Sequence, residues 1–211
     1  MDNFIIVIGR QFGCGGREIG KRIADELGIP YYDKTLLSAA AEEFGMDTEV
    51  FKAVDEKRPS FLRNFLGLSC GTSSQPCTPG AFAHFSAGSL SPEGLYNAQS
   101  KVIQSICERG SCVIVGRTAD YIMRDHPGLI SIFVHAPIEH RVKKIIERGD
   151  AADEIGALPM ARKNDKARES YYNYFTSGGW GKARNYHLCF DSSRFNPESI
   201  VALLKAYINT H

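Results

Sequence analysis

Short runs of apolar, mostly β-branched residues alternate along this chain with segments whose apolar residues recur at helical spacing. Runs of this length are too short for buried helices and are typical of the central strands of a parallel sheet. We expect strands at 4–8, 29–32, 112–115, 129–136 and 186–193, and helices at 17–27, 36–44, 47–57, 93–109, 138–148, 161–175 and 197–208. The alternation of strands and helices predicts an α/β fold on a parallel sheet.

The pattern disappears between residues 58 and 92. This segment is rich in serine, glycine and proline and carries almost no charge over most of its length. A loop this long in a compact domain is usually functional or disordered. Its four phenylalanines favour packing against a substrate or a partner chain: Phe61, Phe65, Phe82 and Phe85.

The composition suits a single globular domain of 211 residues, 43% of them hydrophobic, so a sizeable core is available. A net charge of +1 argues against a broad surface for nucleic acid. No apolar stretch reaches the roughly 18 residues of a membrane span. The chain begins directly with the first strand and without a signal-peptide pattern, so we expect a cytoplasmic protein with no membrane partner.

The six cysteines indicate no disulfide framework and no metal centre. None belongs to a C-x-x-C pair, and no histidines accompany them at zinc spacing. In a cytoplasmic chain of this size we expect free thiols. Cys14 lies in a glycine-rich turn, where a small side chain tolerated for packing is favoured over an oxidation-sensitive site.

The strongest chemical signal is the glycine-rich turn between the first strand and the first helix. Gly13, Gly15 and Gly16 permit backbone angles and close approaches that a Cβ atom would forbid. A strand, a glycine loop and a helix in this order aim backbone N–H groups at a phosphate. The alternative is a turn that serves only strand–helix packing.

The turn departs from the phosphate-loop pattern G-x-x-x-x-G-K-[ST]. With Gly16 as the second glycine, Arg17 takes the lysine position and Glu18 the hydroxyl position. With Gly15 as that glycine, Gly16 takes the lysine position, which is chemically worse. We prefer the first register, because Arg17 still brings a fixed positive charge to a phosphate.

Further polar residues follow the other predicted strands. Arg10 ends the first strand, Asp33 follows the second, and Gly116 and Arg117 follow the strand at 112–115. Ligands of open parallel sheets bind beyond the carboxyl ends of the strands. Each residue alone is ordinary at a strand end, but together they predict one binding edge.

Three segments together resemble the cytidylate kinase-like family of P-loop nucleoside monophosphate kinases. They are IGRQFGCGGREIGKRIADELGIPYYDKTLL, CVIVGRTADYI and ARKNDKARESYYNYFTSGGW, in the family's order and over nearly the whole chain. The resemblance implies a three-layer P-loop NTPase fold: a five-stranded parallel sheet with helices on both faces, a lid and a monophosphate-binding insertion. It implies one domain with a core at 1–57, 93–150 and 183–211, the insertion at about 58–92 and the lid at about 151–182.

The same resemblance implies roles for individual residues. The loop residues Gly13, Cys14, Gly15, Gly16, Arg17 and Glu18 would hold the phosphates of ATP. The acceptor nucleotide would be bound by Arg10, Asp33, Gly116, Arg117 and Asp120, the last compensating for Thr118 where the family has aspartate. Arg162 and Arg168 of the lid would act with Arg17 on the transferring phosphoryl group. Without the resemblance, the charges of the lid segment favour a solvated helix face.

The resemblance therefore implies transfer of a phosphoryl group from ATP to CMP or dCMP, with nucleotides as partners and no nucleic acid. Glu18 either reaches Mg²⁺ or only favours the helix N-terminus electrostatically. We favour the second, so Mg²⁺ is held mainly by ATP and water. Two alternatives stay open: a kinase of another small acceptor, motivated by Thr118 and the insertion, and a nucleotide-binding regulatory module, motivated by the missing lysine and hydroxyl.

Overall fold

The computed structural model describes residues 3–33 and 92–210. The helices predicted at 36–44 and 47–57, and the insertion up to residue 91, lie outside the described residues. The chain divides into two compact units, residues 1–37 with 103–211, and residues 38–102. Of the second unit, the described part is 92–102, the first turns of helix α5 (Pro92–Glu108).

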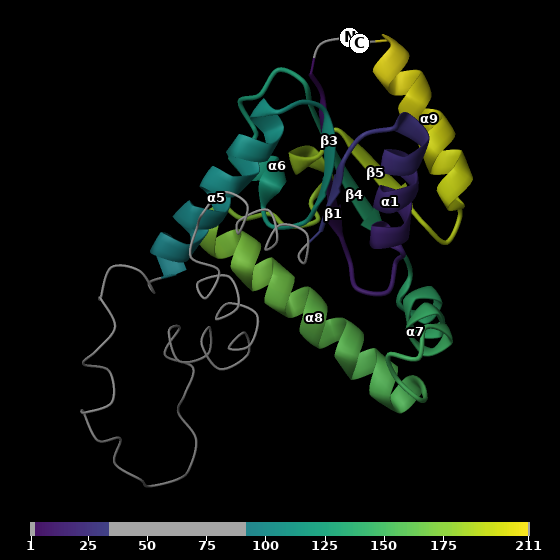
Figure 1. The fold of residues 1–211 in the computed structure, drawn as a ribbon. Coiled ribbons are helices and arrows are strands. Elements are labelled where there is room, and N and C mark those ends of the chain that lie inside the picture. The colour runs from purple at the N-terminus through teal and green to yellow at the C-terminus, as the bar shows by residue number, and fades with distance from the viewer. Residues whose placement is uncertain (1–2, 34–91, 211) are drawn as a thin grey trace, which may run out of the picture. The chain divides into compact units, whose positions relative to one another are not determined.

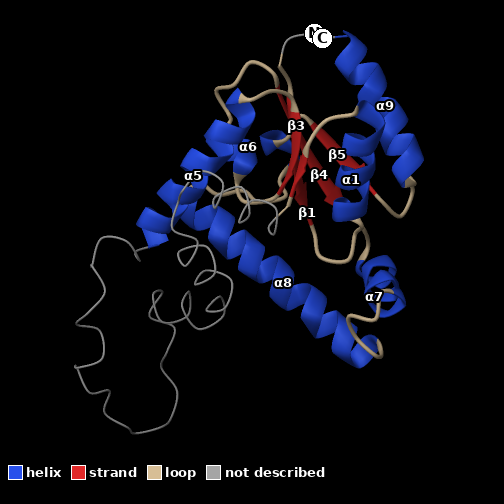
Figure 2. Ribbon diagram, viewed as in Figure 1, coloured by secondary structure: helices blue, strands red, loops and turns tan. Residues whose placement is uncertain are grey.

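A five-stranded parallel sheet forms the centre of the first unit, as predicted (Figure 2). The strand order is β2-β3-β1-β4-β5. The strands are β1 (Ile5–Arg10), β2 (Tyr31–Tyr32), β3 (Cys112–Val115), β4 (Leu129–His135) and β5 (Leu188–Asp191). Ile6 of β1 pairs with Val113 on one side and Ile130 on the other, and all three are buried. The central position of β1 explains its continuous apolar sequence.

Helices lie on both sides of this sheet (Figure 1). They are α1 (Gly16–Leu27), α6 (Ala119–Ile122), α7 (Ile138–Glu147), α8 (Glu154–Phe175), α9 (Pro197–Thr210) and the last turns of α5. Helices α1 and α9 cover one face, where Ile19, Ile23 and Leu204 pack against strand residues such as Val134. Among the described helices, none has the length and apolar character required to cross a membrane.

Several boundaries differ from the sequence-based expectation. Helix α8 begins at Glu154, well before the predicted start at 161, because Asp153 caps it by accepting a hydrogen bond from the Gly156 N–H (2.9 Å). Strand β5 is shorter than predicted. Bends at residues 186 and 187 follow the 3₁₀ turn η1 (Ala183–Asn185), and after β5 the chain turns where the Asp191 side chain accepts from the Ser193 N–H (2.9 Å). The short helix α6 was not predicted.

Candidate active site

The glycine loop joins the carboxyl end of β1 to the start of α1. Gly13 and Gly15 have φ of +83° and +77°, in the left-handed region that favours glycine. Gly15 is the residue that caps α1, and no side-chain hydrogen bond caps this helix in the described structure. A Cβ atom on Gly15 would meet only Oε2 of Glu18, at 3.8 Å, so the space beside it is open. This is the open, uncapped helix start that anion-binding loops use.

Hydrogen bonds join the glycine loop to the end of β4. The Gln11 N–H donates to the carbonyl of Val134 (3.0 Å), and its side-chain oxygen accepts from the Ala136 N–H (3.2 Å). The Cys14 thiol donates to the Gln11 carbonyl (3.1 Å), and burial raises the pKa of this thiol. The side chain of Cys14 therefore supports the loop from the protein interior.

A carboxylate of α8 holds the other side of the loop. Asp165 Oδ1 accepts from the Phe12 N–H at 2.6 Å, and Asp165 Oδ2 accepts from Arg141 Nη1 at 2.5 Å. Arg141 also donates to the carbonyls of Phe12 (3.2 Å) and Ala136 (3.0 Å). Sequence reasoning missed both residues. The signal for Asp165 was its position as the only acidic residue among the basic residues at 162–168.

The two predicted lid arginines occupy different places on α8. Arg168 lies at the loop, where Nη1 donates to the Arg10 carbonyl (3.0 Å) and the guanidinium lies 5.5 Å from the centre of the Phe12 ring. Arg162 is exposed and lines a cavity beside the loop. The structure therefore brings Arg168, but not Arg162, into contact with the loop backbone.

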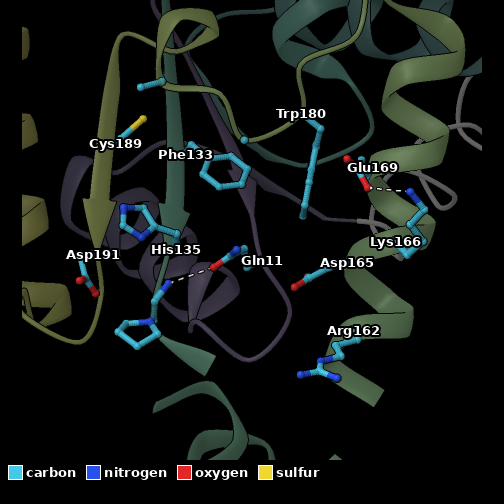
Figure 3. A pocket seen from close by; sticks show the side chains of 14 residues that line it. Gln11, Phe133, His135, Arg162, Asp165, Lys166, Glu169, Trp180, Cys189 and Asp191 are labelled. Carbon is cyan, nitrogen blue, oxygen red and sulfur yellow. Dashed lines mark hydrogen bonds and ion pairs between the residues drawn. The ribbon is translucent and has the colours of Figure 1, made fainter. Parts of the chain in front are cut away.

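This cavity has a volume of about 850 Å³ and lies between α8 and the ends of β4 and β5 (Figure 3). His135 and Asp191 form the strand side, whereas Arg162 and Lys166 come from the helix. Trp180 stands between the two walls, with its ring 5.4 Å from that of Phe133. The volume of the cavity is in the range of small-molecule sites.

Arg10, at the end of β1, passes between two glycines. A Cβ atom on Gly16 would lie 2.8 Å from Cβ and 3.0 Å from Cγ of Arg10. A Cβ atom on Gly116 would overlap Nη1 of Arg10. The aliphatic part of Arg10 therefore lies over the first residue of α1, and its guanidinium lies against the residue that follows β3.

Positive charge is concentrated around Arg10. Burial, followed by repulsion from Arg168, Arg17 and Arg117, lowers the pKa of Arg10 to about 9. The guanidinium groups of Arg168, Arg17 and Arg117 therefore act on that of Arg10, which lies at the carboxyl edge of the sheet. Such a concentration of cations favours an anionic ligand.

The segment after β3 has a strained backbone. Gly116, Arg117 and Thr118 all have positive φ, at +82°, +64° and +54°. A left-handed conformation costs a residue with a side chain about 1–2 kcal/mol. Strain of this kind is concentrated at functional sites. The predicted acceptor residue Arg117 is thus held in a conformation that an unconstrained chain would avoid.

Arg17 lies on the β2 side of the site. Its Nε is 4.0 Å from Oδ2 of Asp33, and the two side chains are 59% and 18% exposed. A pair at this distance with one partner exposed contributes little stability. The contact brings Arg17, predicted to bind ATP, beside Asp33, predicted to bind the acceptor.

Asp120 points into the protein. It is buried and accepts a hydrogen bond from the Tyr172 hydroxyl (2.9 Å) of α8. Burial raises the pKa of Asp120, although the Tyr172 hydrogen bond opposes this shift. Its carboxyl group therefore joins α6 to α8, and a role in recognising the acceptor stays a prediction.

The raised pKa of Asp120 gives an expected pH dependence. The folded state binds this proton more tightly than the unfolded chain, whose ordinary value is 3.8. The resulting stabilisation is present below that value and is lost as the pH rises through the folded pKa. The Asp120→Asn variant lacks this titration. The free energy of unfolding of the wild type minus that of Asp120→Asn should therefore fall as the pH rises above the ordinary value of 3.8.

Urea unfolding followed by the fluorescence of Trp180, the only tryptophan, measures this difference. Asp125→Asn is the matched control, because Asp125 is 88% exposed in its side chain. A wild-type minus Asp120→Asn difference that stays constant or rises over this pH range would contradict the assignment.

Glu18 is exposed in the first turn of α1. Within residues 3–33 and 92–210, no three histidine, cysteine, aspartate or glutamate side chains are grouped so that they could hold a metal ion. The open glycine loop and the surrounding arginines fit the phosphates of a nucleotide, because they combine backbone donors with fixed positive charge.

Known proteins resemble this chain in sequence and in fold. A sequence model of the cytidylate kinase-like family matches residues 5–194. Cytidylate kinases of Pyrococcus horikoshii and Methanopyrus kandleri are each 22% identical to this chain, over 99% and 97% of it and 90% and 93% of their own lengths. The structure of an uncharacterized protein from Eubacterium ventriosum is similar over 99% of both chains (TM-score 0.70, 26% identity). Shikimate kinase from Bacteroides thetaiotaomicron shares the fold over 98% of both chains (TM-score 0.54, 13% identity).

Proposed function

Because the chain belongs to the cytidylate kinase-like family, we propose that it transfers the terminal phosphoryl group of ATP to a nucleoside monophosphate, with CMP or dCMP as the acceptor. The family and the fold make the chain a phosphotransferase. The two cytidylate kinases that it resembles over almost their full lengths support the choice of acceptor.

The observation that carries this proposal is the gathering of arginines at the glycine loop. Burial of Arg10, and then repulsion from the nearby Arg168, Arg17 and Arg117, lowers the pKa of Arg10. Phosphoryl transfer depends on positioning and on neutralising the charge of the phosphoryl oxygens. Arginine serves both needs, because its planar guanidinium is always charged and binds phosphate through two donors. Two nucleotides meeting at this edge would offset the repulsion among the four arginines.

The proposal gives these residues separate roles. The glycine loop and the start of α1 hold the ATP phosphates, and Arg168 lies beside them through its contact with the Arg10 carbonyl. Asp33 and Arg117, at the ends of β2 and β3, bind the acceptor. Arg162 acts from the cavity side. Mg²⁺ bound to ATP would be held mainly by the phosphates and water, and it would supply further neutralisation of phosphate charge.

The first test is the requirement for both nucleotides. ADP should form only when ATP and CMP are both present. Arg17→Ala and Arg117→Ala should each lower kcat/KM by about 100-fold or more, because each removes a charged donor aimed at phosphate oxygens. Lys143→Ala is the control, since Lys143 is a cation on α7 with a 77% exposed side chain and should leave turnover unchanged.

Other outcomes would identify the alternatives. Turnover with a small hydroxylated metabolite but with none of the common nucleoside monophosphates would assign the enzyme another acceptor. Tight ATP binding by calorimetry without transfer to any acceptor would indicate a regulatory module. Either result would overturn the proposed function.

A further inference from the structure

At two positions of the glycine loop, the residue types are exchanged relative to the phosphate-loop pattern. In the pattern G-x-x-x-x-G-K-[ST], the lysine stands six positions after the first glycine. The structure favours counting from Gly15, because Gly15 caps α1 and the helix begins at Gly16. In this register, which differs from the one preferred from the sequence, position 10 should be glycine and position 16 lysine. The chain has Arg10 and Gly16 instead.

The two exchanged positions are in contact. Cβ and Cγ of Arg10 lie 2.8 Å and 3.0 Å from the place that a Cβ atom on Gly16 would occupy. The stem of Arg10 therefore fills the space through which a lysine side chain would leave position 16. The absence of a side chain at Gly16 makes room for the arginine, and the arginine restores a cation beside the loop.

The guanidinium is held at a fixed place beyond the loop. It lies against Gly116, whose missing Cβ leaves the space that Nη1 of Arg10 occupies. The carbonyl of Arg10 accepts from Arg168 Nη1 (3.0 Å), so the strand end itself is tied to α8. With a pKa lowered to about 9, Arg10 remains charged near neutral pH.

We infer that Arg10 is the phosphate-binding cation of this loop and performs from the end of β1 the role of a lysine at position 16. The inference rests on the proposed function in that the phosphates are those of the donor nucleotide. It assigns Arg10 to the donor side, whereas the sequence predicts a contact with the acceptor. Arg17, beside Asp33, is then available to the acceptor side.

The test compares variants that keep or remove this charge. Arg10→Met retains an unbranched stem but lacks the guanidinium, and it should weaken ATP binding by about tenfold or more and lower kcat by about 100-fold. Arg10→Lys should lose less than Arg10→Met. The double variant Arg10→Gly with Gly16→Lys restores the usual order of residues. It should bind ATP and turn over at least tenfold better than Arg10→Gly alone, an effect of about 1.4 kcal/mol.

Calorimetric ATP binding and steady-state turnover are measured for each variant, and thermal unfolding followed by Trp180 fluorescence establishes that each is folded. Wild-type ATP affinity and turnover in folded Arg10→Met would overturn the inference. A folded double variant no better than Arg10→Gly would also overturn it. If the double variant does not fold, the comparison of Arg10→Met with Arg10→Lys decides.

The same measurements separate this inference from the proposed function. In one outcome, Arg10→Met weakens ATP binding but the wild type transfers phosphate to no nucleoside monophosphate. That outcome would support Arg10 as the phosphate-binding cation and contradict the proposed function. Transfer to CMP that is insensitive to Arg10→Met would do the reverse.

Discussion

Asp165→Ala should lower the free energy of unfolding by about 3–5 kcal/mol, because it leaves the Arg141 guanidinium without its carboxylate in a largely buried place. The two side chains of this ion pair are 9% and 16% exposed. Asp165→Ala also removes the acceptor of the Phe12 N–H, so the glycine loop loses a hydrogen bond to α8 as well. The variant should therefore lose turnover as well as stability.

Urea unfolding and steady-state kinetics measure the two effects. Glu169→Ala is the matched control, since Glu169 lies about one turn further along α8 and pairs with Lys166. The side chains of that pair are 41% and 76% exposed, so its loss should cost about 0–1 kcal/mol. Equal losses of stability in Asp165→Ala and Glu169→Ala would contradict the buried bridge.

The second large effect is expected at Gly13. Its φ is +83°, and a Cβ atom there would lie 2.8 Å from the Arg141 carbonyl oxygen and 3.0 Å from two carbons of Ile145. Gly13→Ala thus combines backbone strain of about 1–2 kcal/mol with overpacking of about 1–3 kcal/mol. We expect a total loss of about 2–5 kcal/mol in the free energy of unfolding.

Gly15→Ala is the matched comparison, because Gly15 has a similar φ of +77° but open space beside it. Its stability should fall only by the strain, about 1–2 kcal/mol. Its ATP affinity should also fall, and the loss of unfolding free energy does not account for this, because the new Cβ atom occupies the open side of the loop. Thermal unfolding and calorimetry separate the two effects. A Gly13→Ala variant as stable as Gly15→Ala would show that the loop does not press against α7.

The sequence was most informative where the chemistry is local. Strand β3 was predicted at its observed bounds. Its four consecutive apolar residues are typical of a central strand, which is buried on both faces of the sheet. The glycine loop was found for a similar reason, since its position between a strand and a helix is visible along the chain.

The features that were missed depend on contacts distant along the chain. Phe12 and Asp165 are 153 residues apart, and no pattern within either segment indicates that one donates to the other. The positive φ of Arg117 and Thr118 is equally invisible, because neither residue type favours the left-handed region. The early start of α8 was missed because Pro159 lies inside the helix.

The packing of Arg10 between two glycines has an evolutionary consequence. A side chain at position 16 or at position 116 needs the space that Arg10 now fills. A side chain added at position 16 or 116 alone therefore clashes with Arg10, and replacement of Arg10 by a small residue removes a charge. Relatives with lysine at the position of Gly16 should carry a small residue at the position of Arg10. The three positions would then change together, although they lie in two segments separated by a hundred residues.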